Sequence, residues 1–321
     1  MSTFPILRLP SLAIEAVLEL FRTFDVISFS RVSRNSRSVA IYYCKCRKSS
    51  LKIYARECLR VTIDSWDRFE YAITNVKMDE KQQLFCDSEK NPYRVWVYSE
   101  NPVEKLKELT TELMQILGCS IQVVHISTDV LDVYKIVDWL KSVSNFYEKF
   151  LIHDDKDNSE TTKYILESIK PTKKLYLFAD NPTDGIIEKI PKNLKSITLR
   201  NSTFAQLQKL DGTESILVTN TLSHEDISAF LRSWMAMECH FNLKAFETVI
   251  NAAQVPTILR DIPREVADLA KVKKRAWNVK NLIRAYDIIR EDGTMATVYT
   301  RKEFLFLIFG LYVPSREEVD D

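Results

Sequence analysis

The sequence predicts an α/β protein with a short helical head, an array of repeated strand–helix units on parallel strands, and a C-terminal β-hairpin. Three observations predict this fold class. Residues 4–41 are dense in apolar residues at helical spacing, and apolar pairs two residues apart recur between residues 124 and 245. Near the end of the chain, Asp292-Gly293 separates two runs of alternating residues, which is a strong hairpin signal.

The first helix of the head, which we predict after Leu9-Pro10, carries two apolar stripes. One stripe has the spacing i, i+3, i+4 and i+7, and the other lies beside it; they comprise Ile14, Val17, Leu18 and Phe21, and Leu12, Ala13, Ala16 and Leu20. A surface helix normally presents one apolar face, and a unit below about 40 residues rarely buries a core alone. We therefore expect the head to be completed partly by the rest of the chain and partly by another protein.

Two more helices complete the predicted head. Asp25 is the predicted N-cap of a helix that carries Val26, Ile27 and Phe29, and a third helix follows through Val39 and Ile41. The basic run 45–52 marks a boundary, because alternation typical of a strand follows at Leu59, Val61 and Ile63.

The array is predicted from strand starts at regular intervals. They lie at Val124, Phe150, Leu175, Ile197, Ile216 and Leu243, so the spacings are 26, 25, 22, 19 and 27 residues. This range is close to the period of about 20–29 residues in leucine-rich repeats, whose units each supply one strand and one returning helix. Asn201 and Asn220 fall one position early for a regular repeat, so we expect an irregular leucine-rich-repeat-like solenoid of parallel strands.

Two earlier units fit the array more loosely. One has a strand at 61–63 and a helix from Trp66, and the other has a strand at 95–97 and a helix through residues 106–117. At the far end, the hairpin around Asp292-Gly293 and a strand from Phe304 are expected to cap the sheet edge. The predicted domains are residues 4–46, 50–262 and 263–313.

The charge distribution and the cysteine content limit the possible partners and the cellular compartment. The chain has a net charge of +1, but residues 1–60 hold 11 Lys and Arg against 4 Asp and Glu, which is +7 and leaves −6 for the remainder. The basic head could favour an acidic protein, an anionic membrane or a nucleic acid, or be a solvated face. Six cysteines without a CxxC pair, and no signal peptide, favour reduced thiols in the cytoplasm or nucleus. No apolar run reaches the length of a membrane span.

Catalytic and cofactor chemistry finds little support. The five glycines are too scattered for a phosphate-binding loop. Ser223 and Asp226 read as an N-cap pair rather than as acid–base groups, and the cysteines lack the spacing of metal ligands. We therefore expect no enzyme activity, no cofactor and no metal.

Two segments resemble a known family. Phe4-Pro-Ile-Leu-Arg-Leu-Pro-Ser-Leu-Ala-Ile-Glu-Ala-Val-Leu with Asp25-Val-Ile-Ser-Phe-Ser-Arg-Val-Ser33 resembles an F-box, although position 12 is Leu where many F-boxes carry Glu. Leu222-Ser-His-Glu-Asp-Ile-Ser-Ala-Phe-Leu-Arg-Ser-Trp-Met-Ala-Met237 and Ile258-Leu-Arg-Asp-Ile-Pro263 are similar to the F-box-associated domain (type 2) of a large nematode family. Together these matches bracket most of the chain.

The resemblance implies a substrate-recognition subunit of a Skp–cullin–F-box ubiquitin ligase. Its F-box would dock a Skp-type adaptor and, through it, a cullin scaffold; the matched positions are Leu9, Pro10, Ile14, Val17, Leu18, Asp25, Ile27 and Val32. The array would bind an unknown target protein through exposed neighbours of its strands, with Tyr176, Phe178, Thr198 and Arg200 as candidates. The alternative is a stand-alone repeat scaffold for protein interactions. Membrane binding is not expected, and nucleic-acid binding by the basic head is the least favoured alternative.

Overall fold

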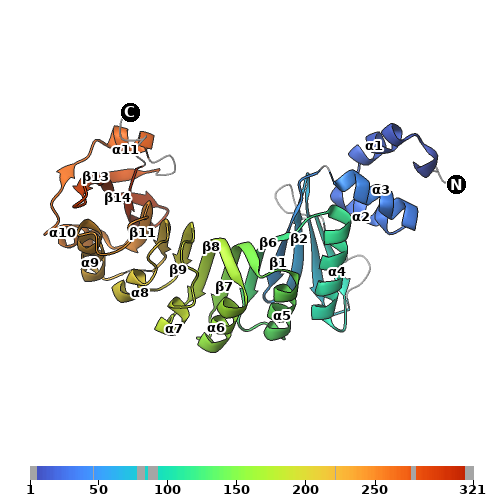
Figure 1. The fold of residues 1–321 in the computed structure, drawn as a ribbon, viewed down its shortest axis with the longest axis horizontal. Helices are drawn as coiled ribbons and strands as arrows, with labels where there is room; N and C mark the ends of the chain where they lie inside the picture. Colours follow the sequence, from blue (N-terminus) through green and yellow to red (C-terminus); the bar gives the residue numbers. More distant parts are fainter. Residues whose placement is uncertain are drawn as a thin grey trace. The chain divides into compact units, whose positions relative to one another are not determined.

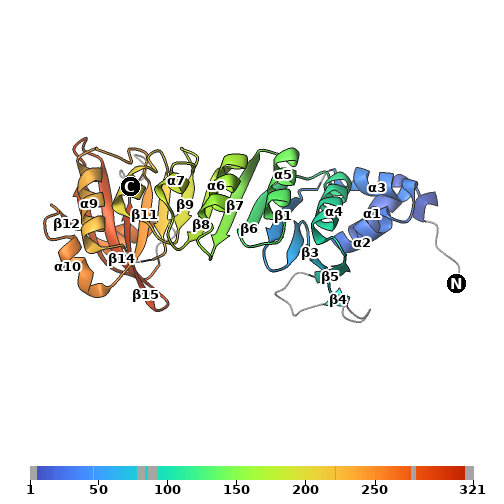
Figure 2. The ribbon, with the colours of Figure 1, turned by 90° about the horizontal axis from the view of Figure 1, so that it is seen from below.

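A computed structural model describes residues 6–45, 47–77, 84–85, 93–220, 222–275 and 280–314 (Figures 1 and 2). The chain divides into two compact units, Met1–Tyr147 and Glu148–Asp321. Helices and strands both contribute to each unit, so the chain is a mixed α/β protein with a helical N-terminal region ahead of a strand-rich remainder. The two units are described separately below.

The helical region of the first unit has a short 3-10 turn, η1 (Ile6–Arg8), and three helices, α1 (Ser11–Glu19), α2 (Thr23–Ser30) and α3 (Arg34–Cys44). We call residues 6–45 the head. The predicted head began at Phe4 and ended at Cys46, and residues 4, 5 and 46 lie outside the described residues.

The caps of the head helices correct one prediction. Arg22, not Asp25, is the N-cap of α2, and Asp25 lies in the first turn, where its Oδ2 accepts a hydrogen bond from Arg22 N at 3.0 Å. The prediction was wrong because an acidic residue serves a helix start equally well at the third helical position, where it binds the N-cap amide. For α3 the cap is Ser33, whose hydroxyl accepts from Ser36 N.

Behind the head, the first unit holds strands β1 (Ser50–Ala55), β2 (Leu59–Asp64), β3 (Arg68–Thr74), β4 (Leu84–Phe85), β5 (Tyr93–Tyr98) and β6 (Ile121–Ser127). Their order is β6-β1-β2-β3-β5-β4. The pairs β1–β6 and β3–β5 are parallel, whereas β1–β2, β2–β3 and β4–β5 are antiparallel. The strand predicted at 95–97 lies in β5.

Helices α4 (Pro102–Leu117) and α5 (Val133–Val143) complete the first unit (Figure 1). The helix predicted through residues 106–117 is confirmed as part of α4, which begins at the N-cap Asn101 and ends at Gly118 in the left-handed conformation. Because α4 packs against β2 and β3, alternate strand residues such as Val61, Ile63 and Phe69 are buried between them.

The helix predicted from Trp66 is wrong. Residues 65–67 form a tight turn, and β3 follows at once in antiparallel register with β2, with Asp64 opposite Arg68. Every residue from Phe69 to Ile73 is buried, as in a strand covered on both faces. Strand β1 was also missed, because its first residues lie in the basic run that we interpreted as a boundary.

In the second unit, strands alternate with helices along the chain. The strands are β7 (Phe146–Asp154), of which the first two residues belong to the first unit, β8 (Lys170–Ala179), β9 (Ser196–Leu199), β10 (Ser215–Val218) and β11 (Ala245–Ile250). The helices between them are α6 (Ser159–Ser168), α7 (Asp184–Ile187), α8 (Phe204–Gln208) and α9 (His224–Met235). The chain order of β8 to β11 is their spatial order, and these strands pair in parallel.

The six predicted strand starts fall on strands β6 to β11, except Leu243, which precedes β11 by two residues. Leu175, Ile197, Ile216 and Phe246 are register partners across β8 to β11, and all four are at most 1% exposed. This row forms the inner layer of the core on which the helices pack. The predicted cap Ser223 is confirmed, since its hydroxyl accepts from Asp226 N at 2.9 Å at the start of α9.

The C-terminal part of the second unit turns antiparallel. After η3 (Ala252–Gln254), α10 (Val255–Ile258), β12 (Glu265–Val266) and α11 (Leu269–Arg275), the chain forms β13 (Leu282–Ile289), β14 (Met295–Glu303) and β15 (Phe306–Tyr312). The strand order is β12-β13-β14-β15-β11. The predicted hairpin is confirmed by the β13–β14 pair, and β15 pairs antiparallel with β11, which covers the edge of that strand.

Candidate functional site

The head is fastened to the rest of the first unit along one side. Thr23 N, at the start of α2, donates to both carboxylate oxygens of Asp67, at 3.1 and 3.3 Å, and Trp66 Nε1 donates to Phe21 O at 3.2 Å. Arg31 forms a fork of two hydrogen bonds to Glu112 of α4, at 2.9 and 2.7 Å. The β2–β3 turn and α4 therefore fix the position of α2, and the pKa of Glu112 lies below its ordinary value because of Arg31.

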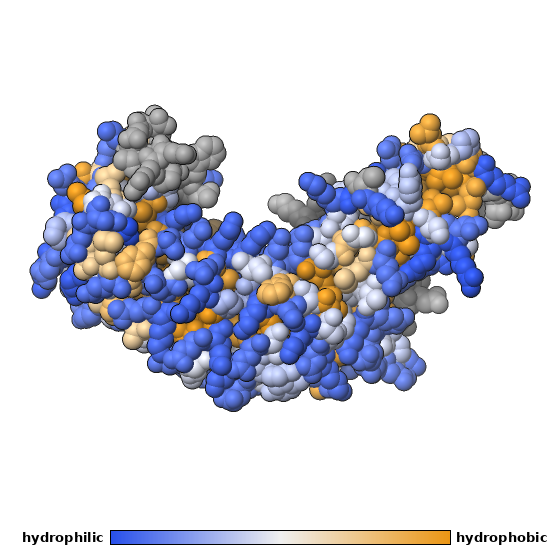
Figure 3. All heavy atoms as spheres, viewed as in Figure 1, coloured by the Kyte–Doolittle hydropathy of each residue, from blue (hydrophilic) through white to orange (hydrophobic). Residues whose placement is uncertain are grey.

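The other side of the head exposes large apolar side chains. Leu12 is 78% exposed, Leu20 85%, Val32 75% and Tyr42 66%. Figure 3 shows the hydrophobic surface over the α1 end of the head. Large apolar side chains exposed to this extent, beside polar residues, are typical of a protein-binding site.

A cavity of about 240 Å³ opens between α1 and α3 on the head. Apolar and aromatic side chains form most of its wall, which comprises Ser11, Ile14, Glu15, Leu18, Ser38, Val39, Tyr42 and Tyr43. The Tyr43 hydroxyl donates to Leu18 O at 2.9 Å, which ties the last turn of α1 to α3. The groove can accept an apolar side chain from a partner.

The structure separates the predicted adaptor-binding residues by exposure. Leu18 and Ile27 are fully buried inside the chain, where they support the head. Leu9, Ile14, Val17 and Asp25 are half-buried, and Pro10 and Val32 are exposed. Whether these eight residues contact an adaptor stays a prediction.

Three residues of the exposed apolar surface were missing from that candidate set: Leu12, Leu20 and Tyr42. The signal for the first two was present in the sequence as the second stripe of α1. Periodicity identified both stripes, but it could not decide which one faces the chain, because that depends on where the β2–β3 turn and α4 lie. The structure turns the second stripe outward.

The predicted target-binding residues lie together on the open face of the second unit, opposite the buried row. Tyr176 and Phe178 alternate along β8, and Tyr176 is the register partner of Thr198 on β9. Lys149 lies over the Tyr176 ring at 5.2 Å, and His153 stacks on Phe178 at 5.0 Å. Arg200 donates to Asp180 at 2.9 Å and to Asp155 at 3.3 Å. Thr198 is 5% exposed and offers little surface.

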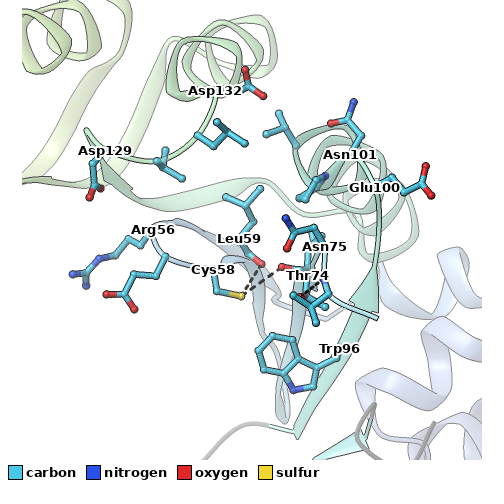
Figure 4. Close-up of a pocket in the computed structure, with 17 residues that line it drawn as sticks. Arg56, Cys58, Leu59, Thr74, Asn75, Trp96, Glu100, Asn101, Asp129 and Asp132 are labelled. Atoms are coloured by element: carbon cyan, nitrogen blue, oxygen red, sulfur yellow. Dashed lines mark hydrogen bonds between the residues drawn. The ribbon is translucent and has the colours of Figure 1, made fainter. Parts of the chain in front are cut away.

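A larger pocket of about 720 Å³ lies in the first unit, at the carboxyl ends of its parallel strands and the start of α4 (Figure 4). Cys58 Sγ donates to Leu59 O at 3.7 Å and to Ile73 O at 3.6 Å, and burial raises the pKa of this thiol. Figure 4 shows Asp129 and Asp132 at separate points on the wall, with carboxylates that do not face each other. Cys58 is therefore a protonated hydrogen-bond donor here rather than an activated nucleophile.

Among the described residues, no three His, Cys, Asp or Glu side chains lie close enough together to hold a metal ion. The four described cysteines, Cys44, Cys58, Cys119 and Cys239, are free thiols. Among the described helices, none combines the length and the apolar character needed to cross a membrane.

Comparison with known families identifies the class of the head. Residues 6–50 match the F-box domain, which covers α1, α2, α3 and the segment up to the first residue of β1. The chain thus carries the domain that docks Skp-type adaptors, in the region where the apolar residues are exposed. No curated protein matches the chain.

Proposed function

We propose that this chain is a substrate-recognition subunit of a Skp–cullin–F-box ubiquitin ligase. The observation that carries the proposal is the exposed apolar side of a head that matches the F-box domain. Burying Leu12, Leu20 and Val32 against an adaptor would stabilise the complex by about 1.5–3 kcal/mol for each fully covered side chain. The excess of basic residues at this end of the chain would also speed association with an acidic adaptor surface.

The anchoring of the head supports this role. A ligase receptor must hold its target at a defined distance and angle from the adaptor, because orientation raises the effective concentration of target lysines. The Asp67 carboxylate and the Arg31–Glu112 fork hold α2 on the first unit at two points. A head held in this way transmits its orientation to the strands that follow.

We propose further that residues 50–262 act as an irregular leucine-rich-repeat-like solenoid that binds the target. The parallel strands β8 to β11, with one helix between each pair of consecutive strands, support this interpretation. The open face with Tyr176, Phe178 and Arg200 is the candidate target surface. Segment 222–237 is the proposed F-box-associated motif, and its Ile227, Phe230 and Trp234 are buried, so that motif would act by maintaining the fold.

The proposal assigns no covalent step to this chain. Its contribution is proximity and orientation, while the bond to ubiquitin forms on other subunits. Neither the described pocket nor the open face brings a nucleophile and a base together, which is consistent with a binding role.

Co-purification with a Skp-type adaptor tests the proposal. The chain with Leu12→Asp and Leu20→Asp should lose adaptor binding by at least about 100-fold, since two buried carboxylates would lack partners. A matched control is Leu131→Asp with Val76→Asp, because these side chains are 78% and 62% exposed in the same unit but lie outside the head. The control should bind as wild type does.

Both variants should keep the wild-type unfolding temperature, since exposed substitutions usually change stability by less than about 0.5 kcal/mol. A wild-type chain that does not bind the adaptor would overturn the proposal and leave a stand-alone scaffold. Unchanged binding by the head variant would overturn it as well.

A further inference from the structure

The open face of the first sheet carries an unusual set of residues in register. Across β5, β3, β2, β1 and β6, successive partners are Trp96, Ala72, Arg60, Tyr54 and His125. In the adjacent row Arg94 is opposite Glu70, which is opposite Thr62. Residues from both of these register rows form one cluster. We call it the arginine–aromatic row, and it consists of Tyr54, Arg60, Glu70, Arg94 and Trp96.

One buried carboxylate organises this row. Glu70 is 3% exposed; its Oε1 accepts from Arg94 Nε at 2.6 Å, and its Oε2 accepts from the Thr62 hydroxyl at 3.1 Å. Arg60 Nη1 lies 3.8 Å from the same Oε1. Two guanidinium groups therefore share one carboxylate, and the site keeps an excess positive charge and unused donors.

Aromatic rings hold the two guanidinium groups in place. Arg60 lies over the Tyr54 ring at 4.9 Å, and Arg94 lies over the Trp96 ring at 5.7 Å. The other neighbour of Tyr54 is the His125 ring, stacked at 4.3 Å. Stacked guanidinium groups lose less freedom when they bind a further acceptor, because their planes are already oriented.

The row is accessible to a partner. Helix α4 packs on the opposite face of this sheet, where Val61 and Ile63 are buried. The Arg60 side chain is 29% exposed and the Arg94 side chain 37%. On the same face the neighbouring Lys52 and Arg68 both pair with Asp64, so four cationic side chains stand beside two carboxylates.

We propose that the arginine–aromatic row is a docking site for an acidic stretch of a partner protein. Charge complementarity selects this occupant, because two oriented guanidinium groups with spare donors match carboxylate oxygens. Nucleic acid fits less well, since base stacking needs free ring faces and the Tyr54 ring is engaged by both His125 and Arg60. The identification of this partner as a ubiquitination target rests on the receptor function proposed above. In that function, the row would select targets with clustered Asp and Glu.

Fluorescence anisotropy on the full chain tests the site. The probe is a labelled peptide of ten glutamates, with a ten-residue polylysine peptide and a polyuridylate oligonucleotide as comparisons. The test variant combines Arg60→Lys and Arg94→Lys, which keeps both positive charges beside Glu70 and so preserves the fold. The matched control, Arg8→Lys with Arg34→Lys, changes two exposed arginines of the basic head.

We expect the wild-type chain to bind the glutamate peptide, and to bind it at least tenfold more weakly when salt rises from 50 to 200 mM. The row variant should lose at least fivefold in affinity, while the control stays within twofold of wild type. Absent binding, equal binding by the row variant, or tighter binding of polyuridylate would each overturn the proposal, the last in favour of nucleic acid.

A fold check and an adaptor check keep this result separate from the ligase proposal. The row variant should unfold at the wild-type temperature; if it does not, Trp96→Leu is the second variant, which removes the ring under Arg94 without touching Glu70, and it must show the same fivefold loss. Adaptor binding should be unchanged in both variants. If the chain binds the glutamate peptide but no adaptor, the proposed acidic-peptide site is supported and the proposed ligase function is wrong.

Discussion

The head and the parallel strands β8 to β11 differ in how far their apolar residues are buried. In the strands, the apolar residues of one face are almost fully buried by the chain itself, and the other face carries polar and aromatic side chains together with the half-buried Leu217 and Val249. In the head, one apolar stripe of α1 is buried or half-buried, whereas Leu12 and Leu20 of the other stripe are left in solvent. The strands are completed by their own helices, whereas the head has an apolar surface left for a partner.

The difference teaches that burial, not hydrophobic content, separates structural from interacting residues. Leu18 lies in the last turn of α1 and Leu20 is its C-cap, yet the first has no exposed surface and the second is 85% exposed. Both would be called core residues from composition. The following predictions, from the largest effect to the smallest, test how far this contrast holds.

Phe246→Ala should have the largest effect on stability. Phe246 is fully buried and stacks on Phe230 with ring centroids 4.3 Å apart, so its removal leaves a cavity that costs about 3–5 kcal/mol. The matched change Leu20→Ala in the head should cost less than about 0.5 kcal/mol. Urea unfolding followed by circular dichroism would measure both changes in the free energy of unfolding. Equal losses would contradict the proposed difference between the buried strands and the exposed side of the head.

Gly310→Ala should destabilise the junction between β14 and β15. The Tyr299 ring occupies the space that a Cβ at position 310 would take, and Tyr299 is held by its hydroxyl, which donates to Glu247 at 2.7 Å. Overpacking of this kind costs about 1–3 kcal/mol. Adding Tyr299→Leu should recover part of the loss in a thermal melt; no loss from Gly310→Ala alone would mean that the ring moves freely.

Asp67→Ala should loosen the head from the first unit. The Asp67 carboxylate accepts the amide of Thr23 at the start of α2, and loss of such a helix cap costs about 0.5–2 kcal/mol. Faster amide hydrogen exchange in residues 22–30 would report it, with the exposed Glu57→Ala of the β1–β2 turn as control. Unchanged exchange would show that apolar contacts alone hold the head.

Glu112→Gln should produce the smallest effect and a pH-dependent one. The hydrogen bond from Arg31 lowers the pKa of Glu112 below its ordinary 4.5, so the carboxylate stabilises the fold above that pH. This contribution, about 0.2–1 kcal/mol for a partly exposed pair, is lost as the pH falls through the lowered pKa. Melting curves of both proteins should therefore differ at pH 7 and converge towards pH 3. A constant difference would assign the effect to packing.

Periodicity predicted the elements better than their surroundings. The strands around Val124, Phe150, Leu175, Ile197 and Ile216, the helix through 106–117 and the hairpin at Asp292-Gly293 all follow from residue spacing, because local alternation reports which side of an element is buried. The prediction for residues 66–74 was wrong because the tight turn at their start contains no glycine or proline to mark it. A strand of alternating Phe69, Tyr71 and Ile73 was then assigned to a helix.

The candidate sites could be predicted only in part, for a different reason. Sequence spacing placed Tyr176 and Phe178 on one side of a strand, and the register with Thr198 then followed from parallel pairing. The arginine–aromatic row was not predicted, because Arg60, Glu70 and Arg94 come from three strands whose order the sequence does not reveal. Contacts between strands depend on which strands are neighbours, and local residue spacing does not report this.

The antiparallel pairing of β15 with β11 has a consequence for how a chain of this design could vary in size. The free edge of β11 is taken by a strand that runs the opposite way and is itself followed by β14, β13 and β12. A duplicated strand–helix segment inserted after β11 would have to displace that whole assembly. Lengthening by tandem duplication is therefore easiest upstream of β11, between strands that already run alike.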